Sequence, residues 1–470
     1  MTRTPVLRFL FSICCMSVVI HACTKDPHLD LSRNGNGEYE EGEELSAGVR
    51  TIFDESALAF NYQIPGVAGD EKLDFFVGNS FFNQNWVEAP SSTTARDGIG
   101  PLFNTRACGS CHLKDGRGQP FINQGLLFRL SIPGAGSHGE PLPEPNYGGQ
   151  LNEHAVQGVA GEGEFVVTYT DNTYHFPDGQ PYTLRTPTYT FTNPGYGNMQ
   201  PDAMVSPRIG QQIIGLGLVE NIRESDLIFL ADEFDKDGDG ISGKINHVFD
   251  AISQTTQPGR FGWKANVASL PHQTAGAFLG DLGITTWLFS NENCTSIQND
   301  CQQAPNGGQP EIDSADLNKV VLYVRTLGVP VRRDYMDETV LKGKAIFNNI
   351  GCEKCHTSKF TTGNTSPIAA LNNVEIRPYS DFLVHDMGPG LADGRPDYRA
   401  SGNEWRTQPL WGLGLIKTVN GHTYLLHDGR ARTITEAIMW HGGEAESSKN
   451  SFGKLSNAER NAVLKFLESL

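Results

Sequence analysis

The chain has 470 residues and a formal net charge of −17 at pH 7, with 37 basic against 54 acidic side chains. This balance argues against a nucleic-acid partner and favours a basic protein or a cationic ligand, although solubility alone would also explain it. The length indicates two or three domains, and the 52 glycines and 26 prolines predict many loops with modest regular structure.

The first residues have the pattern of an export signal. Arg3 and Arg8 precede an apolar run over residues 9–20, which is too short to span a membrane stably. The run leads to Cys23 in a context that resembles a bacterial lipoprotein signal, so we predict a signal peptide over residues 1–22 and a lipid on Cys23. An ordinary secretory signal cut nearby is the alternative. In both cases we expect an exported bacterial protein, periplasmic or anchored in the outer membrane, that contacts the membrane only through its lipid anchor.

The segment that follows is polar and contains many Gly, Asn and acidic residues. We predict a flexible tether over residues 23–50. Ordered structure is expected from about residue 46, with a short helix over residues 45–53. Residues 97–103 then predict the start of a helix that leads to Cys108.

A Cys-x-x-Cys-His stretch occurs twice in the chain, at residues 108–112 and 352–356. Each is the pattern of a covalent attachment site for haem c, in which two thiols form thioethers with the haem vinyl groups and the histidine ligates the iron. A disulfide or zinc pair that happens to precede a histidine is the alternative, but the export signal agrees with cytochrome c maturation. The two predicted haem c groups take their attachment points and proximal ligands from these residues: Cys108, Cys111, Cys352 and Cys355, with His112 and His356.

Strand-type composition appears after the first motif. Residues 165–169 and 188–191 consist of Val, Thr, Tyr and Phe, which predicts a β-rich insertion in an otherwise helical haem domain. Residues 211–219 and 224–234 predict two helices that follow this insertion.

The twelve residues that begin at Asp235 match the first half of an EF-hand loop. Asp235, Asp237 and Asp239 supply oxygens at alternate positions, and the Ile241 carbonyl completes that side. The twelfth position is Asn246, where a bidentate Glu is usual. We predict a structural Ca²⁺ between the haem domains, because three aspartates held this close repel one another without a cation. A solvated acidic turn is the alternative.

Once lipid and haem are assigned, Cys294 and Cys301 are the cysteines that remain in the mature chain. We predict a disulfide between them, since the compartment is oxidising, and two free thiols are the alternative. A helix over residues 314–327 is expected to close the first domain, with Gly328 at its end and Pro330 at the boundary.

The last part of the chain predicts a second haem domain. Residues 337–348 have apolar side chains at helical spacing and lead directly to the second motif. Ser456 and Glu459 form a capping box ahead of an amphipathic C-terminal helix. The predicted fold class is mainly α with a β-rich insertion, in two cytochrome c-like haem domains: residues 51–330, which include the insertion and the calcium-type loop, and residues 331–470.

Several stretches spread over the chain match one known family. They are RDGIGPLF (96–103), GRG (116–118), DGDGISG (237–243), GRFGWKA (259–265), YSDFLVHDMG (379–388), EWRT (404–407), PLWG (409–412), LHDGRART (426–433) and WHGGEA (440–445). On these stretches the chain resembles the bacterial di-haem oxidoreductases, peroxidases often labelled thiol oxidoreductases and distant relatives of the di-haem cytochrome c peroxidases. The resemblance covers most of the chain after the tether and implies haem-based redox chemistry within one oxidoreductase.

The sixth ligand of each iron decides between electron transfer and substrate binding. For the second haem, Met387, His427 and His385 lie downstream of the motif at a distance that suits a cytochrome. Met387 is the preferred distal ligand, because a thioether raises the potential. The two histidines are alternatives, or they hydrogen-bond haem propionates, as Arg430 and Arg432 could.

The first haem has weaker distal candidates in the sequence. Its distal group is expected among three residues: His138, His154 and Met204. Glu162 or Glu164 could act as the acid–base that moves the peroxide proton during O–O cleavage, with a surface glutamate as the alternative. Trp263 could relay electrons between the haems, and a buried packing Trp is the alternative.

We predict an exported di-haem c-type cytochrome oxidoreductase with peroxidase-like enzyme activity. Electrons would come from a small redox protein of the cytochrome or cupredoxin type, pass through one haem and reduce a small molecule such as peroxide at the other. The alternatives are an electron-transfer cytochrome with both irons six-coordinate and no turnover, or a haem-bearing surface lipoprotein that binds a ligand.

Overall fold

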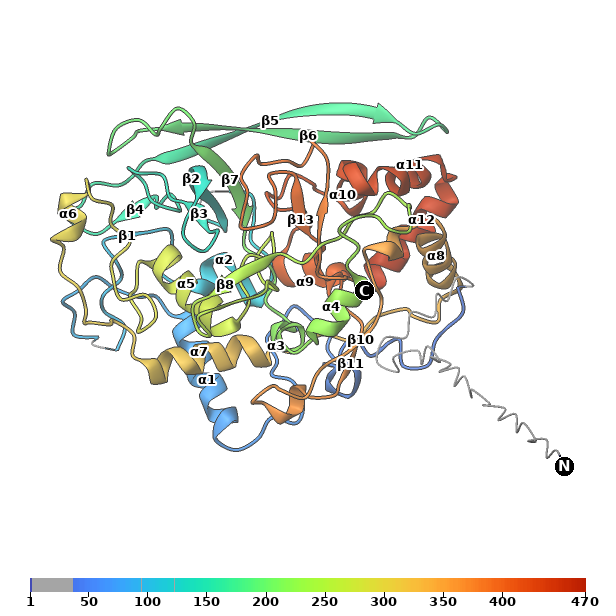
Figure 1. The fold of residues 1–470 in the computed structure, drawn as a ribbon, viewed down its shortest axis with the longest axis horizontal. Helices are drawn as coiled ribbons and strands as arrows, with labels where there is room; N and C mark the ends of the chain where they lie inside the picture. Colours follow the sequence, from blue (N-terminus) through green and yellow to red (C-terminus); the bar gives the residue numbers. More distant parts are fainter. Residues whose placement is uncertain (2–36, 94, 122) are drawn as a thin grey trace.

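The computed structural model describes residue 1 and residues 37–93, 95–121 and 123–470. The predicted signal peptide, Cys23 and the first part of the predicted tether lie outside the described residues. Helices make up 29% and strands 18% of the structure, so the fold is mixed α/β and not mainly α as predicted. The strands form small separate sheets, and within the described ranges no helix is long and apolar enough to cross a lipid bilayer (Figure 1).

Helices pack in a pair close to the first motif. α1 (Asp70–Asn83) lies against α7 (Ser314–Thr326), and Gly78 permits this close approach because a Cβ there would be 2.1 Å from the Lys319 carbonyl oxygen. Tyr323 of α7 lies among the phenylalanines of α1 in the core between the two helices. The helix predicted here is confirmed, and it ends one residue earlier than expected.

No helix forms directly ahead of the first motif. Residues 97–103 predict a helix start, but Gly98 has a φ of +91°, which a right-handed helix cannot contain. Strand β1 (Leu102–Phe103) follows and pairs antiparallel with β4 (His154–Ala155). The chain becomes helical only in the motif itself, in α2 (Cys108–Cys111).

The predicted β-rich insertion is present and larger than its sequence pattern indicated. β5 (Glu164–His175) and β6 (Pro181–Thr192) form one long antiparallel hairpin. β2 (Leu126–Ala135) is the central strand of a sheet with β3 (Pro141–Leu142) and β7 (Met204–Ile209). The hairpin runs along one side of the molecule from the region of β2 to the C-terminal helices α10 and α11, and β6 contacts α10 (Figure 1).

A second helix pair holds the second motif. α8 (Glu338–Asn349) leads into the motif and packs against α12 (Asn457–Ser469). Gly343 lets these helices approach, because a Cβ there would be 2.0 Å from the Ala462 carbonyl oxygen. Both predicted helices are confirmed, and so is the capping box at Ser456.

Residues 37–50, the described end of the predicted tether, are packed into the fold instead of forming a tether. Glu43 is 1% exposed and pairs with Arg332 and Lys344. Lys344 lies 301 residues away in the sequence. The local sequence around Glu43 therefore resembles a solvated acidic linker, because it does not contain the buried partners of Glu43. The helix predicted at this end is only a 3-10 turn, η1 (Gly48–Arg50).

Short elements complete the fold. The helix predicted over residues 211–219 begins only at residue 216, because Gly215 takes the left-handed conformation, and the helix predicted over residues 224–234 ends at residue 230. The remaining elements are α3 (Leu216–Glu220), α4 (Glu224–Leu230), α5 (Leu270–Leu282), α6 (Asn299–Gln302), α9 (Ile416–Asn420), α10 (Ile434–Trp440), α11 (Glu446–Lys454), β8 (His247–Asp250), β9 (Thr255–Pro258), β10 (Phe360–Thr361), β11 (Glu375–Ile376), β12 (Val384–Asp386), β13 (Glu404–Arg406), η2 (Leu113–Asp115), η3 (Cys352–Lys354), η4 (Ala369–Leu371), η5 (Leu413–Leu415) and η6 (Gly443–Ala445).

Replacing the buried Glu43 tests how firmly the N-terminal segment is anchored. Glu43→Gln removes the negative charge between two buried cations, so we expect a loss of about 3–5 kcal/mol in the free energy of unfolding. Denaturant unfolding measures the change. The control is Glu41→Gln on the exposed side of the same segment, which should change stability by less than about 0.5 kcal/mol. Equal stability of both variants would contradict the anchoring.

Candidate haem sites

The first motif lies at a cavity that we call the first cavity. Its walls include Cys108, Cys111 and His112 together with residues of α1, α5 and α7. The Nδ1 atom of His112 lies 2.6 Å from the Gln211 carbonyl oxygen. Because a carbonyl only accepts hydrogen bonds, Nδ1 holds the proton and Nε2 keeps its lone pair for a metal. Burial lowers the pKa of His112, which keeps the ring neutral.

The second motif repeats this arrangement at the second cavity, which is lined by Cys352, Cys355 and His356 and by residues of α8, α10 and α12. The Nδ1 atom of His356 donates to the Tyr379 carbonyl oxygen at 2.9 Å. Burial lowers the pKa of His356 to about 4, so its Nε2 is likewise an available ligand atom. Each motif therefore presents one imidazole lone pair in the orientation that metal-binding histidines need.

The thiols of both motifs suit covalent attachment better than charged thiolate chemistry. All four are free cysteines, and burial raises the pKa of each thiol. Neutral thiols beside largely apolar walls match the vinyl groups with which they would form thioethers. The residues at each cavity therefore fit a covalently bound haem.

One wall is shared by the two cavities. Residues that line both of them are Arg117, Gln212, Trp263, Arg406, Gln408 and Pro409. Trp263 is 6% exposed, and its Nε1 donates to the Ile209 carbonyl oxygen at 2.9 Å. The Arg117 guanidinium lies over its ring, 5.1 Å from the centroid. The structure thus places Trp263 between the two motif sites, where a relay would have to lie.

Two predicted distal residues lie at the second cavity. Met387 and His427 both line it. The His427 ring stacks on Trp405 with 3.9 Å between centroids, and burial lowers its pKa to about 4. Its Nε2 is buried and has no hydrogen-bond partner among the described residues, which suits a nitrogen that ligates a metal. His441, which sequence reasoning missed, also lines this cavity, with Nδ1 bonded to the Ala437 carbonyl oxygen.

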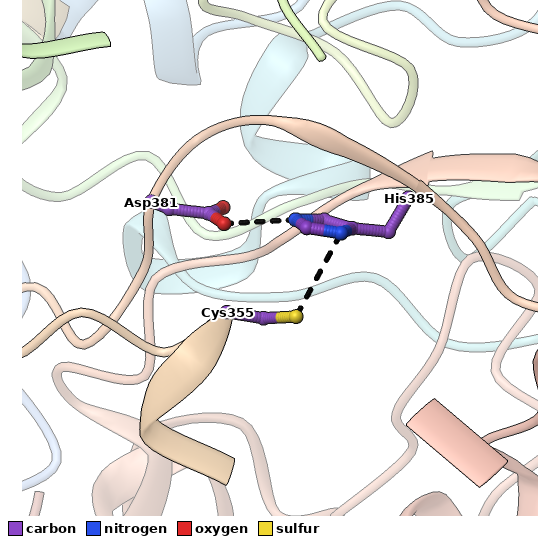
Figure 2. A group of neighbouring side chains, drawn as sticks. All are labelled: Cys355, Asp381 and His385. Atoms are coloured by element: carbon purple, nitrogen blue, oxygen red, sulfur yellow. Dashed lines mark hydrogen bonds and ion pairs between the residues drawn. The ribbon is translucent and has the colours of Figure 1, made fainter. Parts of the chain in front are cut away.

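His385 also lines the second cavity, but it has no lone pair to offer. Its Nε2 lies 2.8 Å from Asp381 Oδ2 and its Nδ1 lies 2.7 Å from Glu444 Oε2. Burial opposes a charge on this ring, yet the Asp381 carboxylate raises the pKa of His385 well above its usual value. Figure 2 shows the imidazole held between the Asp381 carboxylate and the Cys355 sulfur, which lies 3.7 Å from Nδ1. His385 is therefore a charged structural residue next to the second attachment site and not an iron ligand.

The three distal residues predicted for the first haem do not line the first cavity. His138 stacks on Phe249 at 3.8 Å, and His154 bonds Asn123 Oδ1 at 2.5 Å. Met204 is the first residue of β7. As lone residues outside any motif, these three had no local pattern that could place them.

The histidine that does line the first cavity besides the motif is His272 of α5. The Ala251 N–H lies 3.2 Å from its Nδ1, and Asp250 Oδ1 lies 3.3 Å from the same atom. The N–H favours an unprotonated Nδ1 and the carboxylate favours a protonated one, so both tautomers of His272 have a partner here.

Glu162 lies away from both cavities. It is fully buried, accepts hydrogen bonds from the Asn152 N–H at 2.5 Å and from Gln298 Nε2 at 2.6 Å, and lines neither cavity. Burial raises its pKa to about 8. The alternative candidate Glu164 is exposed at the start of β5. The buried carboxyl of Glu162 joins two loops, and the structure does not bring it to either motif cavity.

The predicted calcium loop brings three carboxylates together. Oxygens from these residues lie within 4.8 Å of one another: Asp235, Asp237 and Asp239. Lys354, inside the second motif, donates to one of them at 2.9 Å, and Ile241 lines the second cavity. Asn246 is not part of this cluster, because its side-chain amide donates to the Lys264 and Asp397 carbonyl oxygens at 2.8 and 2.9 Å.

Direct contacts show the outcome for the predicted disulfide and for the two arginines that could bind haem propionates. Cys294 and Cys301 form the predicted disulfide, with Cα atoms 5.8 Å apart. Arg430 pairs with Asp428 at 2.8 Å, and Arg432 pairs with a glutamate four residues later. These two arginines already have carboxylate partners, which makes them poor partners for a haem propionate.

Two Cys-x-x-Cys-His sites, each with its own cavity and oriented imidazole, are the arrangement of a di-haem c-type protein. A family model described as "di-haem oxidoreductase, putative peroxidase" matches residues 40–125 and 134–470. Because this match covers nearly the whole chain, the protein belongs to that family of di-haem oxidoreductases. No curated protein matches the chain.

Removing one motif's thiols tests the assignment of the attachment sites. The double change Cys108→Ser and Cys111→Ser should reduce the covalently bound haem from two groups per chain to one, since thioethers need both thiols. Pyridine haemochrome absorbance and intact mass measure this ratio. Removing Cys294 and Cys301 is the matched control and should leave both haems in place. Retention of two haems in the first variant would contradict the assignment.

Proposed function

We propose that this protein is an exported, peroxidase-like di-haem oxidoreductase that takes electrons from a small redox protein of the cytochrome or cupredoxin type. Electrons enter at the second motif, and a small molecule such as peroxide is reduced at the first. The difference between the two cavities is the observation that supports this division. When bound, haem supplies one-electron iron chemistry at both motifs.

The second cavity has the groups of an electron-transfer site. Met387, His427 and His441 line it, and the buried Nε2 of His427 forms no hydrogen bond in the described structure, with Asp428 Oδ2 3.8 Å away. A sixth ligand from the protein closes the iron to substrate. We therefore assign electron entry to this motif, with His427 or Met387 as its distal ligand.

The first cavity has the groups of a substrate site. The other imidazole at its walls, His272, is held through Nδ1 by Asp250 and the Ala251 N–H, and no methionine of the described residues lines this cavity. Arg129, Arg208 and Arg395 line it, together with Glu140, Asp281 and Asp397. Guanidinium groups can stabilise the negative charge that develops on oxygen when an O–O bond breaks.

Glu140 is the residue that we propose as proton carrier in place of Glu162. It lines the first cavity, and the hydrogen bond that its Oε2 accepts, at 2.8 Å, comes from the backbone N–H of His138. Two other carboxylates line this cavity: Asp397 already pairs with arginines, and Asp281 accepts a hydrogen bond from Gln150 Nε2 at 2.9 Å. A carboxyl group without an ion pair can take up and release the peroxide proton.

The peroxidase proposal is tested by steady-state turnover of hydrogen peroxide with a reduced c-type cytochrome or cupredoxin as donor. We expect turnover by the full di-haem protein and a decrease of about 10²–10⁴-fold in kcat for Glu140→Gln. Glu164→Gln, on the exposed start of β5, is the control and should retain full activity. No turnover with any donor would refute the peroxidase function, whereas an unchanged Glu140→Gln variant would refute only the role of Glu140.

An electron-transfer cytochrome without turnover is the second candidate, and His272 is the observation that favours it. When Nδ1 donates to Asp250, the Nε2 of this ring at the first cavity keeps its lone pair. Both irons would then be six-coordinate, and the protein would ignore peroxide.

Export is part of the proposal, with a lipid on Cys23. The disulfide between Cys294 and Cys301 supports it, since structural disulfides are rare in reducing compartments. Globomycin, which blocks lipoprotein signal cleavage, should cause the precursor to accumulate. Processing that is unaffected by the inhibitor would contradict the lipid anchor.

A structural Ca²⁺ at the three aspartates is a further part of the proposal. The carboxylates converge within 4.8 Å, and a cation would offset their repulsion. We expect a chelator to lower the melting temperature and added Ca²⁺ to restore it, with Asp237→Asn abolishing the response. Calorimetry measures both. A melting temperature that is independent of Ca²⁺ would contradict the site.

A further inference from the structure

Two buried arginines in the wall shared by both cavities lack a carboxylate partner. Arg117 and Arg406 line both cavities and are 8% and 7% exposed. Within the described part of the chain, no Asp or Glu forms an ion pair with either guanidinium. Other buried arginines nearby do have such partners: Arg208, Arg395 and Arg430.

Each guanidinium donates hydrogen bonds to neutral oxygen atoms of the protein. Arg117 donates through Nε and Nη2 to the Tyr424 and Leu426 carbonyl oxygens, both at 3.0 Å. Arg406 donates through Nε to the Gly262 carbonyl oxygen at 3.0 Å, and through Nη2 to the side-chain oxygen of a glutamine at 2.7 Å. No described residue bonds to Nη1 of either arginine, so each guanidinium keeps donors for a group in the cavities.

No ion pair with a side-chain carboxylate of the described residues offsets the cost of burying these two guanidinium charges. Burial lowers the pKa of Arg117 to about 10 and that of Arg406 to about 9. A buried cation needs a counter-ion and further hydrogen bonds to be stable. A negative group bound at the shared wall would therefore stabilise both guanidiniums through the donors that they keep.

We propose that Arg117 and Arg406 are the shared counter-ions of haem propionates from both sites. A propionate is a carboxylate, the group that a guanidinium binds best. This inference rests on the two haems that family membership implies, and not on peroxidase activity.

Sharing has a physical consequence for both irons. A positive charge favours the reduced iron, and a guanidinium at the common wall acts on the two sites together. Arg117 lies over the Trp263 ring at 5.1 Å, and the Arg406 backbone N–H donates to the Trp263 carbonyl oxygen at 2.9 Å. The two arginines and this indole therefore form one junction between the sites.

Equilibrium redox titration of the full di-haem protein, without peroxide, tests the proposal. For Arg117→Gln and for Arg406→Gln we expect the reduced-to-oxidised ratio at a fixed potential to fall about tenfold at both haems, a downward shift of about 59 mV. A propionate that loses its guanidinium has a raised pKa, so both potentials should also become pH-dependent between about pH 5 and 8.

Matched variants separate charge from packing. Arg117→Lys and Arg406→Lys keep the charge and should stay within about threefold of the parent ratio. Arg185→Gln removes a buried guanidinium that bonds only backbone carbonyls and lines neither cavity, so it should leave both potentials unchanged. Circular dichroism and haem content verify that each variant is folded and loaded.

Several outcomes would overturn the proposal. Potentials that do not move in a folded, fully loaded Gln variant would exclude the counter-ion role. A shift at one haem alone would exclude sharing. A raised KM for peroxide at unchanged potentials would assign the arginines to substrate. If a Gln variant loses haem, the Lys variant decides, because loss of haem despite retained charge would contradict an electrostatic role. Failure of peroxide turnover affects none of these readouts.

Discussion

The hydrogen bond from each motif histidine to a backbone carbonyl is the interaction on which both sites depend. It joins His112 to Gln211 and His356 to Tyr379, so it ties each attachment motif to a segment outside it. The bond fixes which ring nitrogen holds the proton, and it leaves the other nitrogen with its lone pair. Without it, two thiols and an imidazole would share a cavity but would have no fixed direction toward an iron.

The second constraint is charge at the wall between the sites. The fold buries Arg117 and Arg406 where it supplies only neutral hydrogen-bond partners, as it does for Arg185, whereas it pairs Arg208 and Arg430 with aspartates. Arg117 and Arg406 differ from Arg185 in that they line both cavities. A negative group bound at this wall would stabilise the folded protein.

Local patterns predicted local structure well. The two motifs, the helix that leads into Cys352, the capping box at Ser456 and the strands near residue 165 all depend on neighbours in sequence, so the sequence was sufficient to find them. Features that depend on distant partners were missed. Glu43 looks like part of a solvated linker until Lys344 is brought beside it. Lone histidines, glutamates and arginines have no period or spacing that would place them at a cavity, and the two junction arginines were missed for this reason.

The central claim is that the two sites differ, with a protein ligand closing the second iron and an open position at the first. Electron paramagnetic resonance of the half-reduced protein tests this most directly, because spin state reports coordination. The account predicts that the remaining ferric iron is high-spin, belongs to the first motif and changes its signal on addition of cyanide. Two low-spin irons that respond to neither cyanide nor peroxide would contradict the account.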